Sequence, residues 1–243
     1  MAEDTIYLKQ FINLYNKCKP VEDLKLTNEE SLIYRLKTNG DSIRMGSTKK
    51  LLKYIPDKES MYSFWRKNKY FWIIPLETTE HNVYGYMLRG VKDKNYSVFK
   101  LDESPSVLFG LYDLEDFNIN RDYIILTEGV KDCLVMKQIY KYVLSVNTAG
   151  ITNKSYNILR ALTNKFILIY DNDEAGSEAI FKDINKLSEE GCIVHKVSLR
   201  FKDPGKYINH PNELQILNSN IQQLLKGSTT NVTHKRRIPK KSR

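Results

Sequence analysis

Two acidic motifs in this chain carry side chains that suit metal-dependent chemistry on phosphates. Glu128 follows one short apolar run, with Asp132 one helical turn later, and Asp171 and Asp173 follow another such run. Carboxylate oxygens are hard ligands, and with no Cys or His beside them they favour Mg²⁺ or Mn²⁺. Acids spaced as Asp-x-Asp can hold one ion or bridge two, as two-metal phosphoryl transfer requires. The residues therefore predict a metal site that acts on phosphates.

The pattern around the two motifs predicts a scaffold that brings them together. After residue 120, apolar runs at 123–127, 143–146, 166–170 and 193–199 alternate with helical patterns at 130–142, 155–162 and 174–189. Strands that are apolar on both faces and joined by helices indicate a mostly parallel sheet covered on both sides. Chemistry collects at the carboxyl ends of such strands, where all four acids meet if the first and third strands are neighbours.

The crowding of these acids also indicates a bound cation. Like charges a few ångströms apart cost about 3 to 4 kcal/mol at an effective dielectric of roughly 20, so a cation should offset them. Each acid also has a structural interpretation, because Asp171 or Asp173 could cap the helix that begins near Glu174, and Glu128 could be a solvated loop residue. The placement of both groups at strand ends favours the site.

The region before this pattern has the features of a smaller α+β unit. The first 70 residues show short helical patterns, and apolar runs at 71–76, 83–91 and 96–101 predict antiparallel strands. Aromatic and basic residues interleave at 62–72. They could stack the bases of a single strand, but core aromatics beside exposed lysines explain the mixture equally well, and we favour that interpretation.

The composition excludes several classes of protein. The chain has 243 residues, 41% of them hydrophobic, enough for a core, and its 3 Cys residues are too scattered for a disulfide framework or a zinc ribbon. No stretch approaches the roughly 20 apolar residues of a membrane span, and the acidic start is unlike a signal peptide. We therefore expect a cytoplasmic protein with no membrane partner.

Most of the positive charge lies at the C-terminal end. The formal net charge is +9, and residues 226–243 hold seven bases and no acid. We expect this segment to be unfolded and, through Lys235, Arg236 and Arg237, to contact nucleic-acid phosphates without sequence preference. The alternative is a solubilising tail that has no partner.

At the acidic motifs the sequence resembles the toprim domain, a metal-binding α/β module shared by DnaG-type primases, topoisomerases and several nucleases. The resemblance rests on Leu126-Thr127-Glu128-Gly129 and on Tyr170-Asp171-Asn172-Asp173-Glu174-Ala175-Gly176, which stand in the family's order. Further segments are similar to primases, namely Glu128-Gly129-Val130-Lys131-Asp132, Lys202-Asp203-Pro204, Gly85-Tyr86-Met87-Leu88-Arg89 and Lys100-Leu101-Asp102. The resemblance covers roughly residues 71 to 210.

This resemblance implies an α/β fold, with a toprim-type mostly parallel sheet flanked by helices and preceded by a small α+β subdomain with antiparallel strands. With the patterns above, it divides the chain into an N-terminal helical part (1–70), an antiparallel basic subdomain (71–120), a toprim domain (121–210), a C-terminal helix (211–225) and a basic disordered tail (226–243).

The resemblance also implies roles for individual residues. Glu128 would be the catalytic acid, and Asp171 and Asp173 would act with it as catalytic residues and metal ligands. Asp132 and Asp203 would be supporting acids at the same metal ions. Arg89 and Lys100 would meet the incoming nucleotide's triphosphate or the template backbone, although both lie on strands whose exposed face should be polar in any case.

The sequence departs from the primase pattern in three places. The late motif usually has a second Asp, and here that position is Gly205. The segment between Pro105 and Phe109 is shorter than in bacterial primases. No Cys/His zinc-binding module precedes the core, and no helicase-binding domain follows it, which assigns template choice and helicase coupling to a separate zinc-binding protein or a replicative helicase.

The resemblance predicts a DNA primase-like nucleotidyltransferase that makes short RNA primers from ribonucleoside triphosphates on single-stranded DNA. The small size suggests, by family analogy, a bacteriophage or mobile-element replication protein acting in the host cytoplasm. Two alternatives stay open: a toprim nuclease that uses the same acids, and a non-catalytic DNA-binding accessory protein of replication. A topoisomerase is disfavoured because no separate domain carries its tyrosine.

Overall fold

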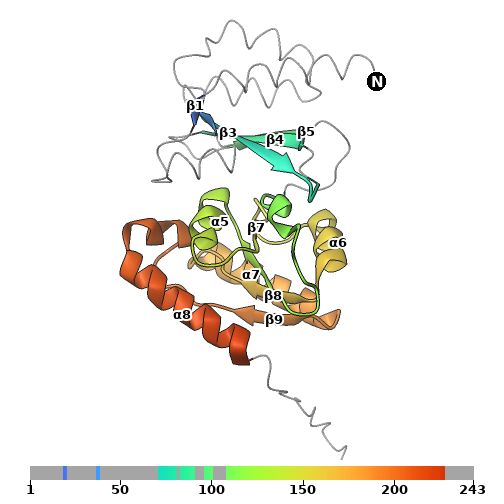
Figure 1. The fold of residues 1–243 in the computed structure, drawn as a ribbon, viewed down its shortest axis with the longest axis vertical. Helices are drawn as coiled ribbons and strands as arrows, with labels where there is room; N and C mark the ends of the chain where they lie inside the picture. The colour runs from blue at the N-terminus through green and yellow to red at the C-terminus, as the bar shows by residue number, and fades with distance from the viewer. Residues whose placement is uncertain are drawn as a thin grey trace, which may run out of the picture.

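The computed structural model describes residues 19–20, 37–38, 71–80, 83–90, 96–100 and 108–227. Two sheets dominate this part of the chain, one antiparallel and one parallel (Figure 1). The helices expected within residues 1–70 lie outside the described residues, as do residues 228–243 of the predicted tail. The first two residues of that predicted tail, Lys226 and Gly227, are helical instead. No helix of the described part is long and apolar enough to cross a membrane.

The antiparallel sheet has five strands in sequential order. Its strands are β1 (Lys19–Pro20), β2 (Lys37–Thr38), β3 (Phe71–Glu77), β4 (Val83–Gly90) and β5 (Tyr96–Lys100). The three apolar runs predicted as strands therefore form β3 to β5. The sequence analysis did not foresee β1 and β2, which are only two residues long.

One face of this sheet contributes to the main core. Ile74 lies opposite Met87 in the register of β3 and β4, and both side chains are buried in the core. Pro75 lies opposite Tyr86 of β4, and on the other side of β3 the described residues of β2 pair only with Trp72 and Ile73. In the described part of the chain, β3 is therefore an edge on its β2 side at Pro75, a position where proline is tolerated.

The second sheet is entirely parallel, with strand order β7-β6-β8-β9. Its strands are β6 (Ile124–Thr127), β7 (Val143–Ser145), β8 (Lys165–Leu168) and β9 (Ile193–Lys196). Every residue of β6 and β7 is buried, which explains their continuous apolar pattern. The prediction of an α/β fold with a mostly parallel sheet is confirmed, and β6 and β8 are neighbours.

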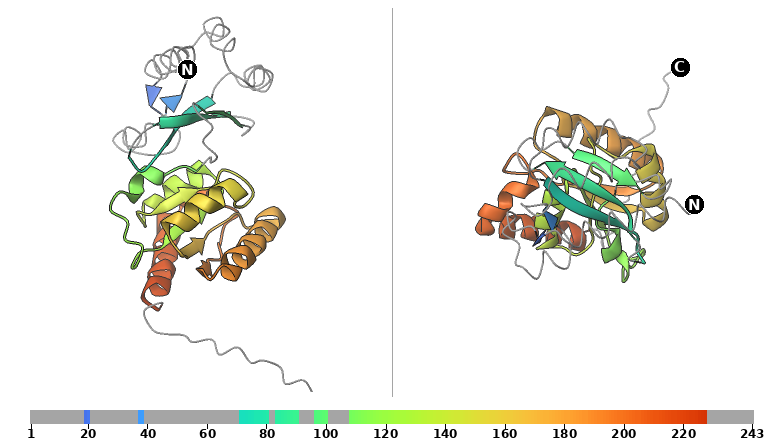
Figure 2. Two further views of the ribbon diagram at one scale, coloured as in Figure 1. Left: turned by 90° about the vertical axis from the view of Figure 1, so that its right-hand side faces the viewer. Right: turned by 90° about the horizontal axis from the view of Figure 1, so that it is seen from above.

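Helices cover both faces of the parallel sheet (Figure 2). The helices are α5 (Val130–Lys137), α6 (Asn153–Leu162), α7 (Glu174–Glu189) and α8 (Pro211–Gly227), with short 3₁₀ helices η2 (Leu111–Leu114) and η3 (Pro204–Asn209). α5 packs against η3, which packs against α8. α6 and α7 are joined by a hydrogen bond from Lys186 to Asn153.

Helix α5 is shorter than the predicted 130–142 and ends at Lys137. The apolar residues beyond Lys137 have helical spacing, but their side chains contact residues next to the sheet instead of continuing the helix. The Tyr140 hydroxyl donates to the Tyr123 carbonyl oxygen at 2.9 Å, and the Tyr142 ring packs edge-on against Phe117 at 5.1 Å between centroids. Tertiary packing of the two tyrosines therefore overrides the local helical pattern.

Candidate active site

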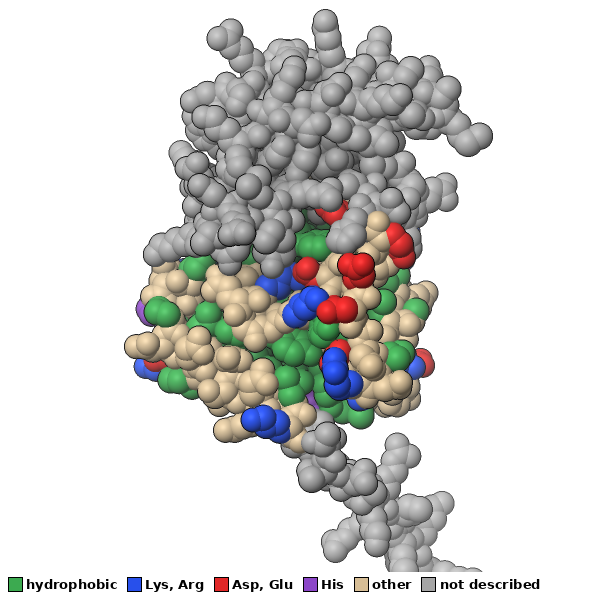
Figure 3. All heavy atoms as spheres, viewed as in Figure 1, with side chains coloured by type: hydrophobic (Ala, Val, Ile, Leu, Met, Phe, Trp, Pro, Cys, Tyr) green, Lys and Arg blue, Asp and Glu red, His purple; other side chains and the backbone are tan. Residues whose placement is uncertain are grey.

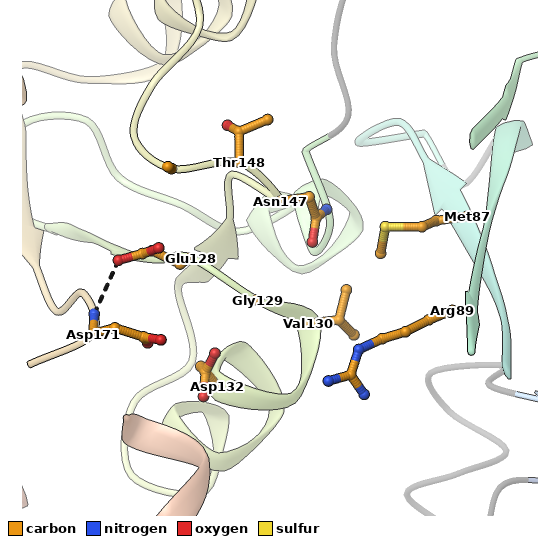
Figure 4. Close-up of a pocket in the computed structure, with 10 residues that line it drawn as sticks. Met87, Arg89, Glu128, Gly129, Val130, Asp132, Asn147, Thr148 and Asp171 are labelled. Carbon is orange, nitrogen blue, oxygen red and sulfur yellow. Dashed lines mark hydrogen bonds between the residues drawn. The ribbon is translucent and has the colours of Figure 1, made fainter. Parts of the chain in front are cut away.

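The acidic motifs meet at the carboxyl ends of β6 and β8. Leu126 pairs with Leu168 in the parallel register, so Glu128 and Asp171 emerge at the same edge. The Asp171 backbone N–H donates to Glu128 Oε1 at 3.0 Å (Figure 4). The hydroxyl of Ser145, at the end of β7, donates to the Glu128 carbonyl oxygen at 3.0 Å. The ends of three strands therefore fix the position of Glu128.

A cavity of about 310 Å³ opens between this edge and the antiparallel sheet. The carboxylates of Glu128, Asp132 and Asp171 line one part of it, and Arg89 reaches in from β4 (Figure 4). A loop that follows β7, residues 147–149, forms a further wall. Opposite charges thus face one cavity from two different sheets.

Burial and mutual repulsion act on the carboxylates of the cavity. The Asp132 side chain opens onto the cavity, but its carboxyl group is surrounded by protein atoms, and this burial, followed by the charge of Asp171, raises its pKa to about 7. Burial likewise raises the pKa of Glu128, although the hydrogen bond from the Asp171 N–H opposes the shift. Charge on these groups is therefore costly unless a cation is close.

The two acids of the Asp-x-Asp motif lie in different surroundings. Asp173 is the N-cap of α7, where its Oδ1 accepts from the Gly176 N–H at 3.0 Å. Its Oδ2 lies 3.4 Å from Lys202 Nζ. The Gly176 N–H and then Lys202 hold the pKa of Asp173 below its ordinary value. Asp173 is not among the residues that line the cavity.

The late motif approaches the cavity through backbone atoms. The Gly205 N–H donates to Asp132 Oδ1 at 2.7 Å. A Cβ at position 205 would lie 2.9 Å from Asp132 Oδ1 and 3.2 Å from Asp203 Oδ1. Asp203 therefore adjoins Asp132, and there is no room between them for a side chain at Gly205.

Gly176 has a comparable role in the Asp-x-Asp motif. A Cβ there would lie 2.1 Å from the Asp171 carbonyl oxygen and 2.9 Å from Glu128 Oε1. Real Cβ atoms do not approach other atoms so closely, so only glycine lets α7 begin this close to the two acids. The glycine that closes the motif is thus explained by packing.

The predicted cationic residues are only partly within the described structure. Arg89 is half-buried, and burial lowers its pKa while Asp132 acts in the opposite direction. The backbone of Lys100 pairs with Gly85, but its side chain lies outside the described residues. Lys235, Arg236 and Arg237 lie outside them as well. On the face shown in Figure 3, acidic and basic side chains lie side by side, without a surface of one sign.

The sequence analysis missed part of the cavity wall. Met87 and the loop at residues 147–149 line the cavity, and the sequence analysis gave neither of them a role. Asn147 adopts a left-handed backbone conformation with φ 54°, which Asn tolerates better than most residues. Its side-chain Oδ1 lies 2.8 Å from the Ser145 hydroxyl oxygen, so the single proton of that hydroxyl is shared between Asn147 and the Glu128 carbonyl. An Asn between a buried strand and a glycine was the available signal.

As it stands, the site is not a closed metal cage. Among the residues that the structure describes, no group of three or more His, Cys, Asp or Glu side chains is close enough together to hold a metal ion. Mg²⁺, however, usually binds through one or two carboxylates, with substrate phosphates and water completing its shell. The donors at this cavity are all oxygens, so their chemistry fits such an ion.

Comparison with known proteins agrees with this architecture. The Toprim-like family matches residues 125–208. The DNA primase of Aquifex aeolicus is 31% identical over 183 residues, which are 68% of this chain but only 36% of that protein. The crystal structure of the zinc-binding and RNA polymerase domains of the Aquifex aeolicus primase superposes with a TM-score of 0.61 at 22% identity, covering 85% of this chain and 54% of that one.

A structure of a DnaG primase catalytic domain bound to single-stranded DNA is also similar. It has a TM-score of 0.59 and 17% identity, and the match covers 83% of this chain and 69% of that one. At these identities the structural likeness speaks for the fold, and the sequence match speaks for the family. The chain is a toprim-domain protein built like the catalytic core of DnaG-type primases.

Proposed function

We propose that this protein is a primase-type nucleotidyltransferase that joins ribonucleotides into a short primer on single-stranded DNA. The observation that carries the proposal is the cavity where Glu128, Asp132 and Asp171 face Arg89. Acids that can hold divalent cations and a guanidinium that can neutralise phosphate are the groups that nucleotidyl transfer needs. The likeness to proteins named DNA primase, one of them bound to single-stranded DNA, supports the choice of reaction and template.

The metal of this proposal is Mg²⁺ or Mn²⁺. Glu128, Asp132 and Asp171 would hold it at the cavity, with Asp173 and Asp203 as the neighbouring acids. When bound, such ions stabilise negative charge on the transferred phosphoryl group and favour deprotonation of the attacking hydroxyl. The raised pKa values of Glu128 and Asp132 support this assignment, because a cation would relieve the cost of their ionised forms.

The chain's own residues then have distinct tasks. Arg89 offers a fixed cation to the triphosphate of the incoming nucleotide, which partly neutralises it and orients it. The attacking 3′-oxygen forms a bond to the α-phosphorus while the bond to pyrophosphate breaks. Glu128 is placed to take the hydroxyl proton, since one of its oxygens is held by the Asp171 N–H and its raised pKa makes it a stronger base than an ordinary glutamate.

The partners follow from this reaction. We propose that ribonucleoside triphosphates and single-stranded DNA bind at the cavity, and that Lys100 and the basic C-terminal residues contact the nucleic-acid backbone. A replicative helicase or a zinc-binding template-recognition protein would select where synthesis begins. We propose that the protein acts in the cytoplasm, together with these partners.

Primer synthesis tests the proposal directly. Wild-type protein, supplied with single-stranded template, labelled ribonucleotides and Mg²⁺ or Mn²⁺, should extend primers, and Glu128→Gln should lower the rate by about 10² to 10⁴-fold. Glu178→Gln is the matched control, because Glu178 is an exposed residue of α7 away from the cavity lining. Equal yields from all three proteins would overturn the site.

The same assay separates the alternatives. A toprim nuclease would degrade labelled DNA or RNA in Mg²⁺ without added nucleotides, and Glu128→Gln would abolish that degradation. A non-catalytic accessory protein would bind single-stranded DNA without forming any product, and neither Glu128→Gln nor Glu178→Gln would change its affinity.

A further inference from the structure

Asp183 is a buried acid that the toprim motifs do not explain. It lies in the middle of α7 and is 1% exposed, on the buried stripe of the helix that also carries Ala179, Ile180 and Leu187. A carboxyl group in such a position is costly unless hydrogen bonds satisfy it. An apolar side chain would serve the core better, so the contacts of Asp183 should explain its presence.

The Asp183 carboxyl joins two walls of the cavity. Its Oδ2 accepts from the Ile151 backbone N–H at 2.9 Å and from the Tyr170 hydroxyl at 2.9 Å. Ile151 ends the loop whose residues 147–149 line the cavity, and Tyr170 directly precedes the cavity acid Asp171. One oxygen atom therefore connects the wall loop to the chain that carries an acidic residue of the site.

The loop itself is compact and leaves little freedom to its position. Its backbone is left-handed at both Asn147, with φ 54°, and Gly150, with φ 92°. The Thr148 hydroxyl closes it by donating to the Gly150 carbonyl oxygen at 2.6 Å. A loop held so tightly within itself moves as a unit, so its attachment to the rest of the molecule decides where residues 147–149 lie.

That attachment is close. A Cβ on Gly150 would lie 3.1 Å from Asp183 Oδ2 and 3.4 Å from the Ala179 Cβ. The loop thus packs directly on α7, and Gly150 allows this approach. Helix α7 begins at Glu174, immediately after the Asp-x-Asp motif. The same helix therefore fixes the acidic motif through its first turn and the opposite loop through Asp183.

We propose that Asp183 is a positioning residue for nucleotide binding. It holds the wall loop, residues 147–151, at the distance from the acids that a nucleoside triphosphate requires, without touching the nucleotide itself. This role rests on the primase function proposed above. Losing the carboxyl group should weaken nucleotide binding while leaving the chemical step of a bound nucleotide largely intact.

The test combines amide exchange with primer synthesis on the full chain. In Asp183→Ala, the Ile151 amide should exchange with deuterium at least about tenfold faster than in wild type, because its acceptor is gone. The KM for ribonucleotides should rise by about tenfold, with a change in kcat of less than about threefold. Asp183→Asn keeps an oxygen acceptor for both donors and should restore both measurements to near wild-type values.

Two further variants separate the loss of these hydrogen bonds from a general loss of folding stability. Tyr170→Phe removes one of the two hydrogen bonds and should raise the KM in the same direction by a smaller factor. Leu187→Ala opens the buried core one helical turn beyond Asp183 on the same helix and removes none of the hydrogen bonds to the loop. It should lower the melting temperature with no change in KM. If Leu187→Ala raised the KM as much as Asp183→Ala, a merely structural role would explain the effect and the proposal would fail.

The loop offers a matched pair of glycine variants. Gly150→Ala pushes a methyl group toward Asp183 and should raise the KM. Gly191→Ala introduces the same strain at a left-handed residue with φ 78°, but nothing lies within 4 Å of its Cβ, so the KM should not change. Equal KM values for the two variants would contradict the positioning role.

The outcomes also separate this inference from the primase proposal. If wild-type protein makes no primers, the primase function and the nucleotide role of Asp183 fall together. If wild-type protein is active and the Asp183→Ala loop exchanges faster with an unchanged KM, only the role of Asp183 is overturned. Faster exchange, a raised KM and rescue by Asp183→Asn together support it.

Discussion

The acids on the two sides of the loop at residues 171–173 have opposite electrostatic surroundings. On the cavity side, Asp171 and Asp132 are crowded among other carboxylates, and the pKa of Asp132 rises to about 7. On the helix side, Asp173 receives a backbone N–H and a lysine, and its pKa falls. The comparison teaches that the fold supplies Asp173 with a backbone N–H and a lysine, whereas burial and neighbouring carboxylates make the ionised form of Asp132 costly.

The sharpest way to break this comparison is to neutralise each acid of the motif in turn. Asp171→Asn should reduce primer synthesis by about 10² to 10³-fold, because it removes a carboxylate from the cavity that we propose to bind the metal and the nucleotide. Asp173→Asn preserves the helix cap and should reduce the rate by about tenfold or less.

Initial rates of ribonucleotide incorporation across a Mg²⁺ titration measure both effects. The exposed substitution Glu178→Gln again provides the control. Equal losses from Asp171→Asn and Asp173→Asn would show that both acids belong to one metal site, and the division drawn here would be wrong.

A second prediction concerns stability and pH on the cavity side. The pKa of Asp132 is raised from its ordinary 3.8 to about 7, so the native state holds this proton more tightly than the unfolded chain. The stabilisation of the native state by this bound proton is complete below about pH 4 and is lost as the pH rises through about 7. Without divalent metal, the free energy of unfolding of Asp132→Asn should therefore rise relative to that of wild type over this pH range, by on the order of 2 to 4 kcal/mol.

Urea unfolding at pH 4 and at pH 8, in the presence of EDTA, measures this difference between the two proteins. The asparagine can still accept the hydrogen bond from Gly205, so the comparison isolates the charge. A difference in unfolding free energy that does not change with pH would mean that burial of Asp132 imposes no cost in the native state.

The smallest expected effect lies on the helix side. Asp173→Ala removes the N-cap of α7 and should lower the melting temperature by about 2 to 4 °C, whereas Asp173→Asn, which can cap equally well, should change it little. Because the pKa of Asp173 is lowered, its stabilisation is present above its unfolded pKa and fades as the pH falls.

Differential scanning fluorimetry of wild type and the two Asp173 variants at pH 7 and pH 4 checks this prediction. The gap in melting temperature between wild type and Asp173→Ala should be smaller at the acidic pH, as the wild-type carboxylate becomes protonated. A gap that widened in acid would contradict a role for the ionised side chain in capping.

Much of the scaffold was predictable because its signals are local. The apolar runs that became β6 and β8 are buried on both faces, and strands of that kind form parallel sheets, so the approach of Glu128 to Asp171 followed from topology. The end of α5 was not predictable in the same way. The spacing that continues to Tyr142 is helical, and only the contacts of Tyr140 and Tyr142 with residues distant in sequence show that these tyrosines lie outside the helix.

The details of the site depended on backbone direction after each strand, which sequence spacing does not determine. Nothing in Asp-x-Asp indicates which acid turns toward the cavity and which caps the helix. Asp183 was missed because an acid within a helical pattern is usually solvated. Its position on the apolar stripe of α7, between Ile180 and Leu187, was the signal that could have found it.

The contact between Gly205 and Asp132 limits how this protein could change over time. At this position a backbone N–H donates to the Asp132 carboxylate, and a Cβ on residue 205 would lie only 2.9 Å from that oxygen. An acidic side chain introduced there would have to displace the Asp132 carboxylate before it could add a ligand. Such a substitution would therefore be accommodated only together with a shift of side chains on η3 and α5.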